Sequence, residues 1–202
     1  MVLAIALLAA LAAVAVALVA AFTGGGSVTH PPAPPGSEFK GAALIPSPVA
    51  PPFTLTDVNG NRTSLAGLRG RVVAIAFLDS RCSPGCVLVA QQVRGALDEL
   101  QHQPAVLFVS VDPRADTPAS VRSFLQSASL ASRVRYLVGP EQALRDVWRA
   151  YRVTTPSAGR AAFERALPVL LIDAQGRQRV LFEQEQLTPE ALAHDIRTLQ
   201  DG

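Results

Sequence analysis

The stretch VVAIAFLDSRCSPGC, residues 72–86, decides the fold. Its first part, Val72 to Phe77, is a continuous apolar run rich in β-branched residues, which is typical of a strand buried on both faces of a sheet. From Val87 to Leu100, apolar side chains then recur at helical spacing. The pattern therefore predicts a buried strand that leads into a helix through two cysteines.

Strand-like and helix-like patterns alternate in the rest of the chain. Asn59-Gly60, between two short alternating stretches, indicates a β-hairpin at the start of the domain. The other predicted elements are strands at 105–111, 136–138, 168–172 and 179–182 and helices at 118–127, 141–151 and 188–202, with a loop at 154–166. This order predicts an α/β sandwich with a mixed central sheet.

Two segments of different character precede the domain. Val2 to Phe22 holds 21 consecutive residues without a charge, enough for a helix that crosses ~30 Å of hydrocarbon. Residues 1–22 are therefore predicted to be a transmembrane anchor, and a cleaved signal segment is the alternative. Residues 23–52 are rich in proline and glycine and are predicted to be an extended tether. The folded domain is expected at residues 53–202.

The charge pattern excludes one class of partner. The chain has 18 basic and 16 acidic residues, a net charge of +2, and no block of like charges. Binding of phosphates requires a clustered basic face, so nucleic acid is not an expected partner. The expected partners are the membrane, through the N-terminal helix, and another protein, and the domain is expected to be a monomer.

Cys82 and Cys86 are the only cysteines, and they lie where the strand gives way to the helix. The positive end of a helix, together with Arg81, stabilises a thiolate, which is the species that attacks disulfides and binds soft metals. The spacing alone does not choose between redox work and metal work. A structural disulfide is the alternative, although a bridge across so short a loop adds little stability.

Two aspartates follow neighbouring predicted strands, at the ends where α/β folds place their sites. Asp79 and Asp112 are each a candidate proton acceptor for the second thiol. The alternative for Asp112 is a structural turn with Pro113.

Several segments in the right order resemble the Sco/SenC family of copper-delivery proteins, which have the thioredoxin fold. The segments that carry the resemblance are 53–60, 68–77, Cys82-Ser-Pro-Gly-Cys86, 109–118, 137–144 and 171–176. The resemblance covers most of residues 52–200. It implies a thioredoxin-like three-layer sandwich, an extracytoplasmic domain on a single-pass membrane anchor, copper at Cys82 and Cys86, and a role in cytochrome oxidase assembly.

The chain departs from the family pattern at the metal site. The family's copper-binding histidine falls on Arg165, which keeps its proton and cannot bind a metal. The prolines that follow the family's two cysteines are replaced by Ser83 and Val87. The remaining histidines, His30, His102 and His194, are not expected at the cysteines.

Pro168 is the third predicted site residue. Ala166-Leu-Pro168 before a buried strand resembles the thioredoxin pattern in which a cis proline faces the cysteines and shapes the groove for a partner's chain. The alternative is an ordinary trans proline at the start of a strand.

The missing histidine favours thiol–disulfide exchange, with Cys82 as the more exposed, attacking thiol and Cys86 as the resolving thiol. The alternative is a Cu(I) metallochaperone with both cysteines as ligands, and a third hypothesis is a degenerate member that only binds. In each case the expected partner is a protein that carries a disulfide or a copper site, such as an oxidase subunit. A peroxidase of the peroxiredoxin kind is a further candidate, but that family's threonine and arginine around a lone cysteine are not evident.

Overall fold

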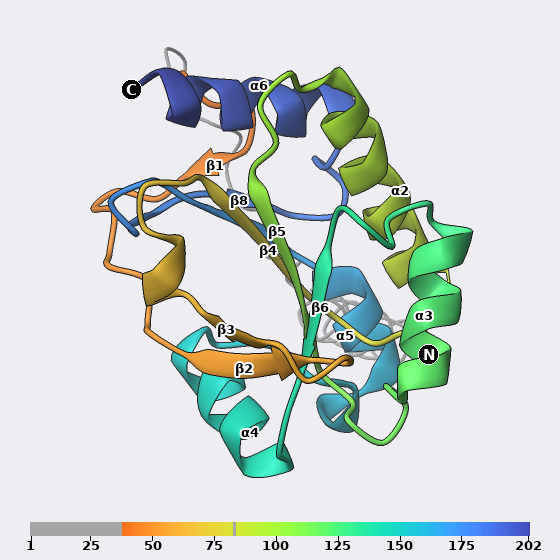
Figure 1. Ribbon diagram of the computed structural model, residues 1–202. Helices are drawn as coiled ribbons and strands as arrows, with labels where there is room; N and C mark the ends of the chain where they lie inside the picture. The colour runs from red at the N-terminus through yellow and green to blue at the C-terminus, as the bar shows by residue number, and fades with distance from the viewer. Residues whose placement is uncertain (1–37, 83) are drawn as a thin grey trace, which may run out of the picture. The chain divides into compact units, whose positions relative to one another are not determined.

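The computed structural model describes residues 38–82 and 84–202 (Figure 1). The predicted anchor at 1–22 and the first part of the predicted tether lie outside these residues. Among the described residues, no helix combines the length and the apolar character that a bilayer crossing needs.

A mixed sheet forms the centre of the described domain, as the sequence predicted. Its strands follow the order β1-β8-β7-β4-β5-β6-β2-β3. The strands are β1 (Ala42–Ala43), β2 (Thr54–Asp57), β3 (Arg62–Ser64), β4 (Val73–Leu78), β5 (Ala105–Ser110), β6 (Arg135–Val138), β7 (Val169–Ile172) and β8 (Gln178–Phe182).

The buried strands are those with continuous apolar runs. β4, β5 and β6 run parallel, with Val73 opposite Ala105 and Leu78 opposite Ser110, while β7 pairs antiparallel with β4 on its other side. Every residue of β4, β5 and β7 is buried. This is the pattern expected of central strands that are covered on both faces.

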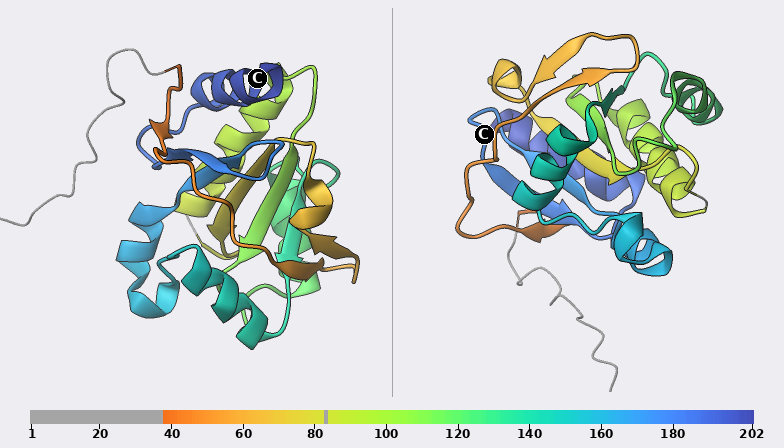
Figure 2. Two further views of the ribbon diagram at one scale, coloured as in Figure 1. Left: turned by 90° about the vertical axis from the view of Figure 1, so that its left-hand side faces the viewer. Right: turned by 90° about the horizontal axis from the view of Figure 1, so that it is seen from below.

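Helices cover the sheet on both faces, so that the domain has three layers (Figure 2). The helices are α2 (Gly85–Glu99), α3 (Pro118–Ser127), α4 (Glu141–Ala150), α5 (Arg160–Ala166) and α6 (Pro189–Asp201), with 3-10 turns η1 (Ala66–Leu68) and η2 (Pro156–Ala158). α2 and α6 pack against each other, and α5 lies against α2. The connection from β4 through α2 to β5 places the cysteines at the carboxyl end of a central strand.

Part of the segment predicted as tether belongs to the sheet. From Glu38 onward the chain packs on the domain, β1 pairs with β8, and Leu44 N–H donates to the Arg179 carbonyl at 2.8 Å. The sequence pattern missed this pairing because a two-residue strand among prolines shows no alternation. Backbone hydrogen bonds to β8 and the buried side chains of Phe39 and Ala50 hold the segment.

The prediction of a loop at 154–166 was wrong, because the structure has η2 and α5 there. α5 is only seven residues long, so helical periodicity has too few turns to be visible in the sequence. Tertiary packing stabilises it, since Phe163 is 1% exposed.

Candidate functional site

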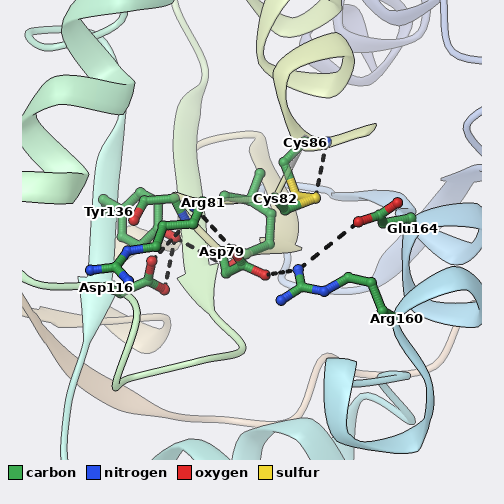
Figure 3. Close-up of a disulfide and its surroundings, with 10 residues drawn as sticks. Asp79, Arg81, Cys82, Cys86, Asp116, Tyr136, Arg160 and Glu164 are labelled. Carbon is green, nitrogen blue, oxygen red and sulfur yellow. Dashed lines mark hydrogen bonds and ion pairs between the residues drawn. A yellow bond between two sulfur atoms is a disulfide. The ribbon is translucent and has the colours of Figure 1, made fainter. Parts of the chain in front are cut away.

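Cys82 and Cys86 form a disulfide at the start of α2 (Figure 3). The S–S distance is 2.14 Å and the two Cα atoms are 5.4 Å apart. The helix begins only at Gly85, so that Cys86 lies in its first turn and Cys82 lies before it. The disulfide therefore joins the segment before the helix to the first turn of the helix.

The first turn of α2 directs a backbone donor at one sulfur. The Cys86 N–H donates to Cys82 Sγ at 3.2 Å, and no side chain caps the helix at Pro84. The first N–H groups of a helix have no partner within the helix and carry its partial positive charge. When the disulfide is reduced, the same donor can stabilise a thiolate on Cys82.

Both cysteines are buried, which differs from the expected exposure of Cys82. Cys82 is 2% exposed and Cys86 is 0% exposed. The residues beside them come from α5 and from the segment after it: a Cβ atom built on Gly85 would lie 2.7 Å from Leu167 Cδ1 and 3.3 Å from the Glu164 carbonyl oxygen. The helix that the sequence missed therefore packs against the disulfide turn.

A buried carboxylate connects this helix to the end of β4. Asp79 is 0% exposed, and its Oδ2 accepts a hydrogen bond from Arg160 of α5 at 2.9 Å (Figure 3). Its Oδ1 accepts from the backbone N–H of Arg81 at 3.0 Å. Asp79 thus has partners on both oxygens, and its predicted part as a proton acceptor stays a prediction.

A second buried carboxylate, which sequence reasoning missed, supports the same turn. Asp116 Oδ1 accepts from the Ser80 N–H at 2.7 Å and Oδ2 accepts from the Tyr136 hydroxyl at 2.9 Å. Burial raises the pKa of Asp116 above its usual value. Burial and the neighbouring Asp116 charge raise the pKa of Tyr136 well above its usual value, so Tyr136 remains a neutral donor.

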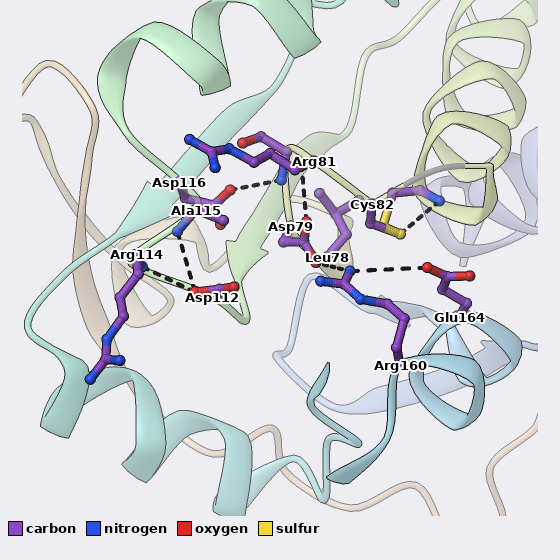
Figure 4. Close-up of polar contacts among 12 residues, drawn as sticks. Leu78, Asp79, Arg81, Cys82, Asp112, Arg114, Ala115, Asp116, Arg160 and Glu164 are labelled. Carbon is purple, nitrogen blue, oxygen red and sulfur yellow. Dashed lines mark hydrogen bonds and ion pairs between the residues drawn. A yellow bond between two sulfur atoms is a disulfide. The ribbon is translucent and has the colours of Figure 1, made fainter. Parts of the chain in front are cut away.

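Asp112 stabilises a turn, which was the alternative to its prediction as a proton acceptor. Its Oδ1 accepts from the backbone N–H groups of Arg114 and Ala115 at 3.1 and 3.2 Å, so it closes a turn (Figure 4). Asp112 and Asp116 lie four residues apart in this turn, and only the buried Asp116 reaches the segment before Cys82. A signal for Asp116 was available in the same motif, but spacing alone did not show which aspartate points inward.

Pro168 precedes β7 as expected, but its peptide bond is trans. Among the described residues the cis peptide bond is Ile45–Pro46. The cis form expected from the thioredoxin pattern is therefore not found, and the alternative, a trans proline at a strand start, is correct. Pro168 is half-buried, and its neighbour Leu167 is the residue that packs against Gly85.

The position of the family's copper-binding histidine holds Arg165 in this chain. Arg165 is exposed on α5. His194 Nδ1 lies 2.9 Å from Asp195 on α6, and His102 lies beyond the far end of α2, whose 15 residues span about 22 Å. In the described part of the chain, no three histidine, cysteine or acidic side chains are grouped to hold a metal. Of the histidines named in the sequence, His30 lies outside the described residues.

The sequence is similar to Sco proteins and to proteins described as putative peroxiredoxins. The SCO1/SenC family model matches residues 42–201. The putative peroxiredoxins of two Mycobacterium tuberculosis strains are 32% identical over 112 residues, which is 55% of this chain and 68% of theirs. The mitochondrial SCO2 homolog of Bos taurus is 28% identical over 106 residues, 50% of this chain and 39% of that protein.

The solved structures that are similar include Sco proteins of several bacteria. Apo Sco1 of Thermus thermophilus superposes with a TM-score of 0.65 at 20% identity, covering 80% of this chain and 96% of that one. Copper-bound ScoI of Bradyrhizobium japonicum gives 0.57 at 25% identity, covering 75% and 99%. The match to the family model over most of the domain decides the assignment: the chain belongs to the SCO1/SenC family and has its thioredoxin-like fold.

Proposed function

We propose that this chain is a membrane-anchored, extracytoplasmic thiol–disulfide oxidoreductase that reduces a disulfide in a partner protein. The observation that carries the proposal is the Cys82–Cys86 disulfide with the Cys86 N–H directed at Cys82 Sγ. The bond closes a loop too short to add much stability, so a structural part for it is the weaker explanation.

The reaction is a two-electron exchange between dithiols and disulfides. In the reduced protein, the Cys82 thiolate attacks one sulfur of the partner's disulfide, forms a mixed disulfide and releases a partner thiolate, which takes up a proton. The Cys86 thiol then loses its proton and attacks Cys82 Sγ, which forms the Cys82–Cys86 bond and releases the second partner thiol. The partner gains two electrons and two protons, and a dithiol donor returns this domain to its reduced form.

The geometry distinguishes the two cysteines. The hydrogen bond from the Cys86 N–H to Cys82 Sγ, at 3.2 Å, and the partial positive charge at the start of α2 favour a thiolate on Cys82. Cys86 itself lies within the first turn of the helix. This supports Cys82 as the attacking thiol on electrostatic grounds, in place of the exposure that the sequence suggested. Membership of the SCO1/SenC family favours a partner that carries the cysteines of a copper site, such as a cytochrome oxidase subunit.

Two other functions each have one observation in their favour. A relative with bound copper at 25% identity favours a Cu(I) metallochaperone, in which Cys82 and Cys86 would hold the ion as two thiolates. The relatives described as putative peroxiredoxins favour peroxide reduction. In that reaction a Cys82 thiolate takes one oxygen from hydrogen peroxide, and Cys86 displaces water from the resulting sulfenic acid to form the disulfide.

Trapping of the mixed disulfide tests the oxidoreductase. The reduced full chain is mixed with a peptide that carries one disulfide. The parent should reduce it stoichiometrically and end as the Cys82–Cys86 disulfide, whereas Cys86→Ser should stop at a mixed disulfide on Cys82. Cys82→Ser should react with the peptide at ~10% of the parent's rate or below, because its remaining thiol lacks the N–H donor. Accumulation of the adduct in Cys82→Ser, and not in Cys86→Ser, would reverse the assignment.

The same reduced protein separates the other two functions. Titration with Cu(I) against a competing chelator should show that copper is not retained one-to-one, and addition of hydrogen peroxide should oxidise the pair no faster than a small free thiol. Tight copper retention with slow exchange would favour the chaperone. Peroxide oxidation many times faster than that of the free thiol would favour the peroxidase.

A further inference from the structure

The oxidised site presents an access problem for the proposed function, on which this inference rests. A partner's sulfur must reach Cys82 in line with the bond that breaks, yet Cys82 is 2% and Cys86 0% exposed. The segment beside the pair is α5, which carries Arg160 and Glu164 (Figure 3). Leu167, which follows it, packs against Gly85, the first residue of α2. Exchange in either direction therefore requires that a neighbouring segment move, and α5 with Leu167 is a segment that packs on Gly85, between the two cysteines.

The contacts of α5 are few. Phe163 at 1% and Leu167 at 2% exposure supply its apolar contact with the domain. Its charged contact with the body of the domain is Arg160 on Asp79, an ion pair that joins a half-exposed guanidinium to a fully buried carboxylate at 2.9 Å. The second partner of Arg160, Glu164 at 4.0 Å, lies on α5 itself and does not tie the helix to the sheet.

The chain before α5 permits such a movement. Gly159 separates η2 from α5. It has φ +128° and ψ +118°, a backbone conformation that residues other than glycine disfavour. A short segment with two buried apolar residues, Phe163 and Leu167, and a glycine at its start opens at lower free-energy cost than the central strands. Asp79 retains the Arg81 N–H when Arg160 leaves, so the buried carboxylate is not left without a donor.

We propose that Arg160 is a positioning residue that holds α5 closed over the Cys82–Cys86 disulfide through Asp79, so that partners reach the sulfurs only when this ion pair opens. The ion pair then sets the fraction of time for which the disulfide is accessible. It acts on access from outside, and it leaves the chemistry of the sulfurs to the α2 N-terminus.

Reduction by a water-soluble phosphine tests this proposal without any partner. The phosphine attacks a sulfur, and water completes the reaction to the phosphine oxide and two thiols. In the full chain, Arg160→Met keeps much of the side-chain volume without the charge. It should be reduced roughly 5- to 10-fold faster, because the guanidinium that is lost is half-exposed and makes a modest contribution to the closed state. Arg160→Lys should restore a rate near that of the parent.

Arg165→Met is the matched control, because Arg165 is an exposed arginine on the same short helix. It should react within about twofold of the parent, as expected for a surface substitution. A second variant, Gly85→Ala, acts without any change of charge: its methyl group would lie 2.7 Å from Leu167 Cδ1 and should also accelerate reduction by displacing α5.

Hydrogen exchange distinguishes local opening from loss of the whole fold. In Arg160→Met, faster exchange confined to residues 159–167 supports the proposal, and faster exchange spread over β4 and β5 overturns it. Equal reduction rates for the parent, Arg160→Met and Arg165→Met would also overturn it. The reduction potential and the peptide-reduction assay report on the proposed function separately. If the parent reduces the peptide as expected but Arg160→Met is reduced by the phosphine at the parent's rate, only the inference about Arg160 is contradicted.

Discussion

Asp116 is the residue that best shows how local burial affects this domain. It accepts from Ser80 at 2.7 Å and from Tyr136 at 2.9 Å, and so fixes the turn that ends at Cys82. Burial raises the pKa of its carboxyl above the ordinary value of 3.8. A raised carboxyl pKa means that the folded protein holds this proton more tightly than the unfolded chain does.

The sign of the pH effect follows from that difference. Below pH 3.8 the protonated carboxyl contributes its full stabilisation, and this contribution is lost as pH rises through the higher folded-state pKa. We therefore expect the free energy of unfolding of the parent to fall relative to Asp116→Asn as pH rises from about 4. Asparagine can still accept from Ser80 and does not ionise.

Urea unfolding at a series of pH values measures this difference. Asp201→Asn, at the exposed end of α6, is the control and should show no such trend. The free energy of unfolding of the parent, relative to that of Asp116→Asn, could instead stay constant or rise with pH. Either result would contradict a raised pKa for the buried Asp116.

Among the elements, α6 binds the segment that leads into β1 through Asp195. Asp195 is 0% exposed and accepts from the backbone N–H groups of Lys40 at 2.8 Å and Gly41 at 2.9 Å. These donors belong to the segment that leads into β1. One carboxylate therefore joins two ends of the domain that are about 150 residues apart in the chain, as the separations of 155 and 154 residues show.

Asp195→Ala should detach this segment. The substitution leaves two backbone N–H groups without their charged acceptor, and we expect a loss of about 3 kcal/mol in the free energy of unfolding. Hydrogen exchange at Gly41 to Leu44 should rise more than exchange in β4. Asp201→Ala serves as the control, and a loss below about 0.5 kcal/mol in Asp195→Ala would show that the contact does not stabilise β1.

The elements also show what the sequence could and could not reveal. Long patterns predicted β4, β5 and α2 correctly, because six or more buried or periodic residues give a clear signal. β1 and α5 were missed because they are short and depend on distant partners, Asp195 and the α2 N-terminus. The cysteine pair was predicted, but its burial was not, and the helix that packs on Gly85 between the two cysteines was also missed.

For the whole molecule, the core and not the disulfide should maintain the fold. Three central strands are entirely buried, and the loop closed by the disulfide spans a separation of four residues. The chain-entropy relation gives about 2 kcal/mol for so short a loop. The double variant Cys82→Ala, Cys86→Ala should therefore remain folded.

Circular dichroism and urea unfolding of this double variant check that expectation. The spectrum should match that of the oxidised parent, with a free energy of unfolding lower by ~2 kcal/mol or less. Loss of the folded spectrum would mean that the disulfide is a structural requirement, which would contradict a part in redox chemistry.

The reduction potential of the Cys82–Cys86 pair shows whether the disulfide can take part in thiol–disulfide exchange. The full chain is equilibrated in buffers of reduced and oxidised dithiothreitol, and its free thiols are then alkylated. Mass spectrometry gives the fraction of the protein that was reduced. We predict a reversible two-electron couple with a potential above about −300 mV and no loss of the folded spectrum on reduction. A pair that stays oxidised down to potentials below about −300 mV, or that is reduced only when the protein unfolds, would contradict the account.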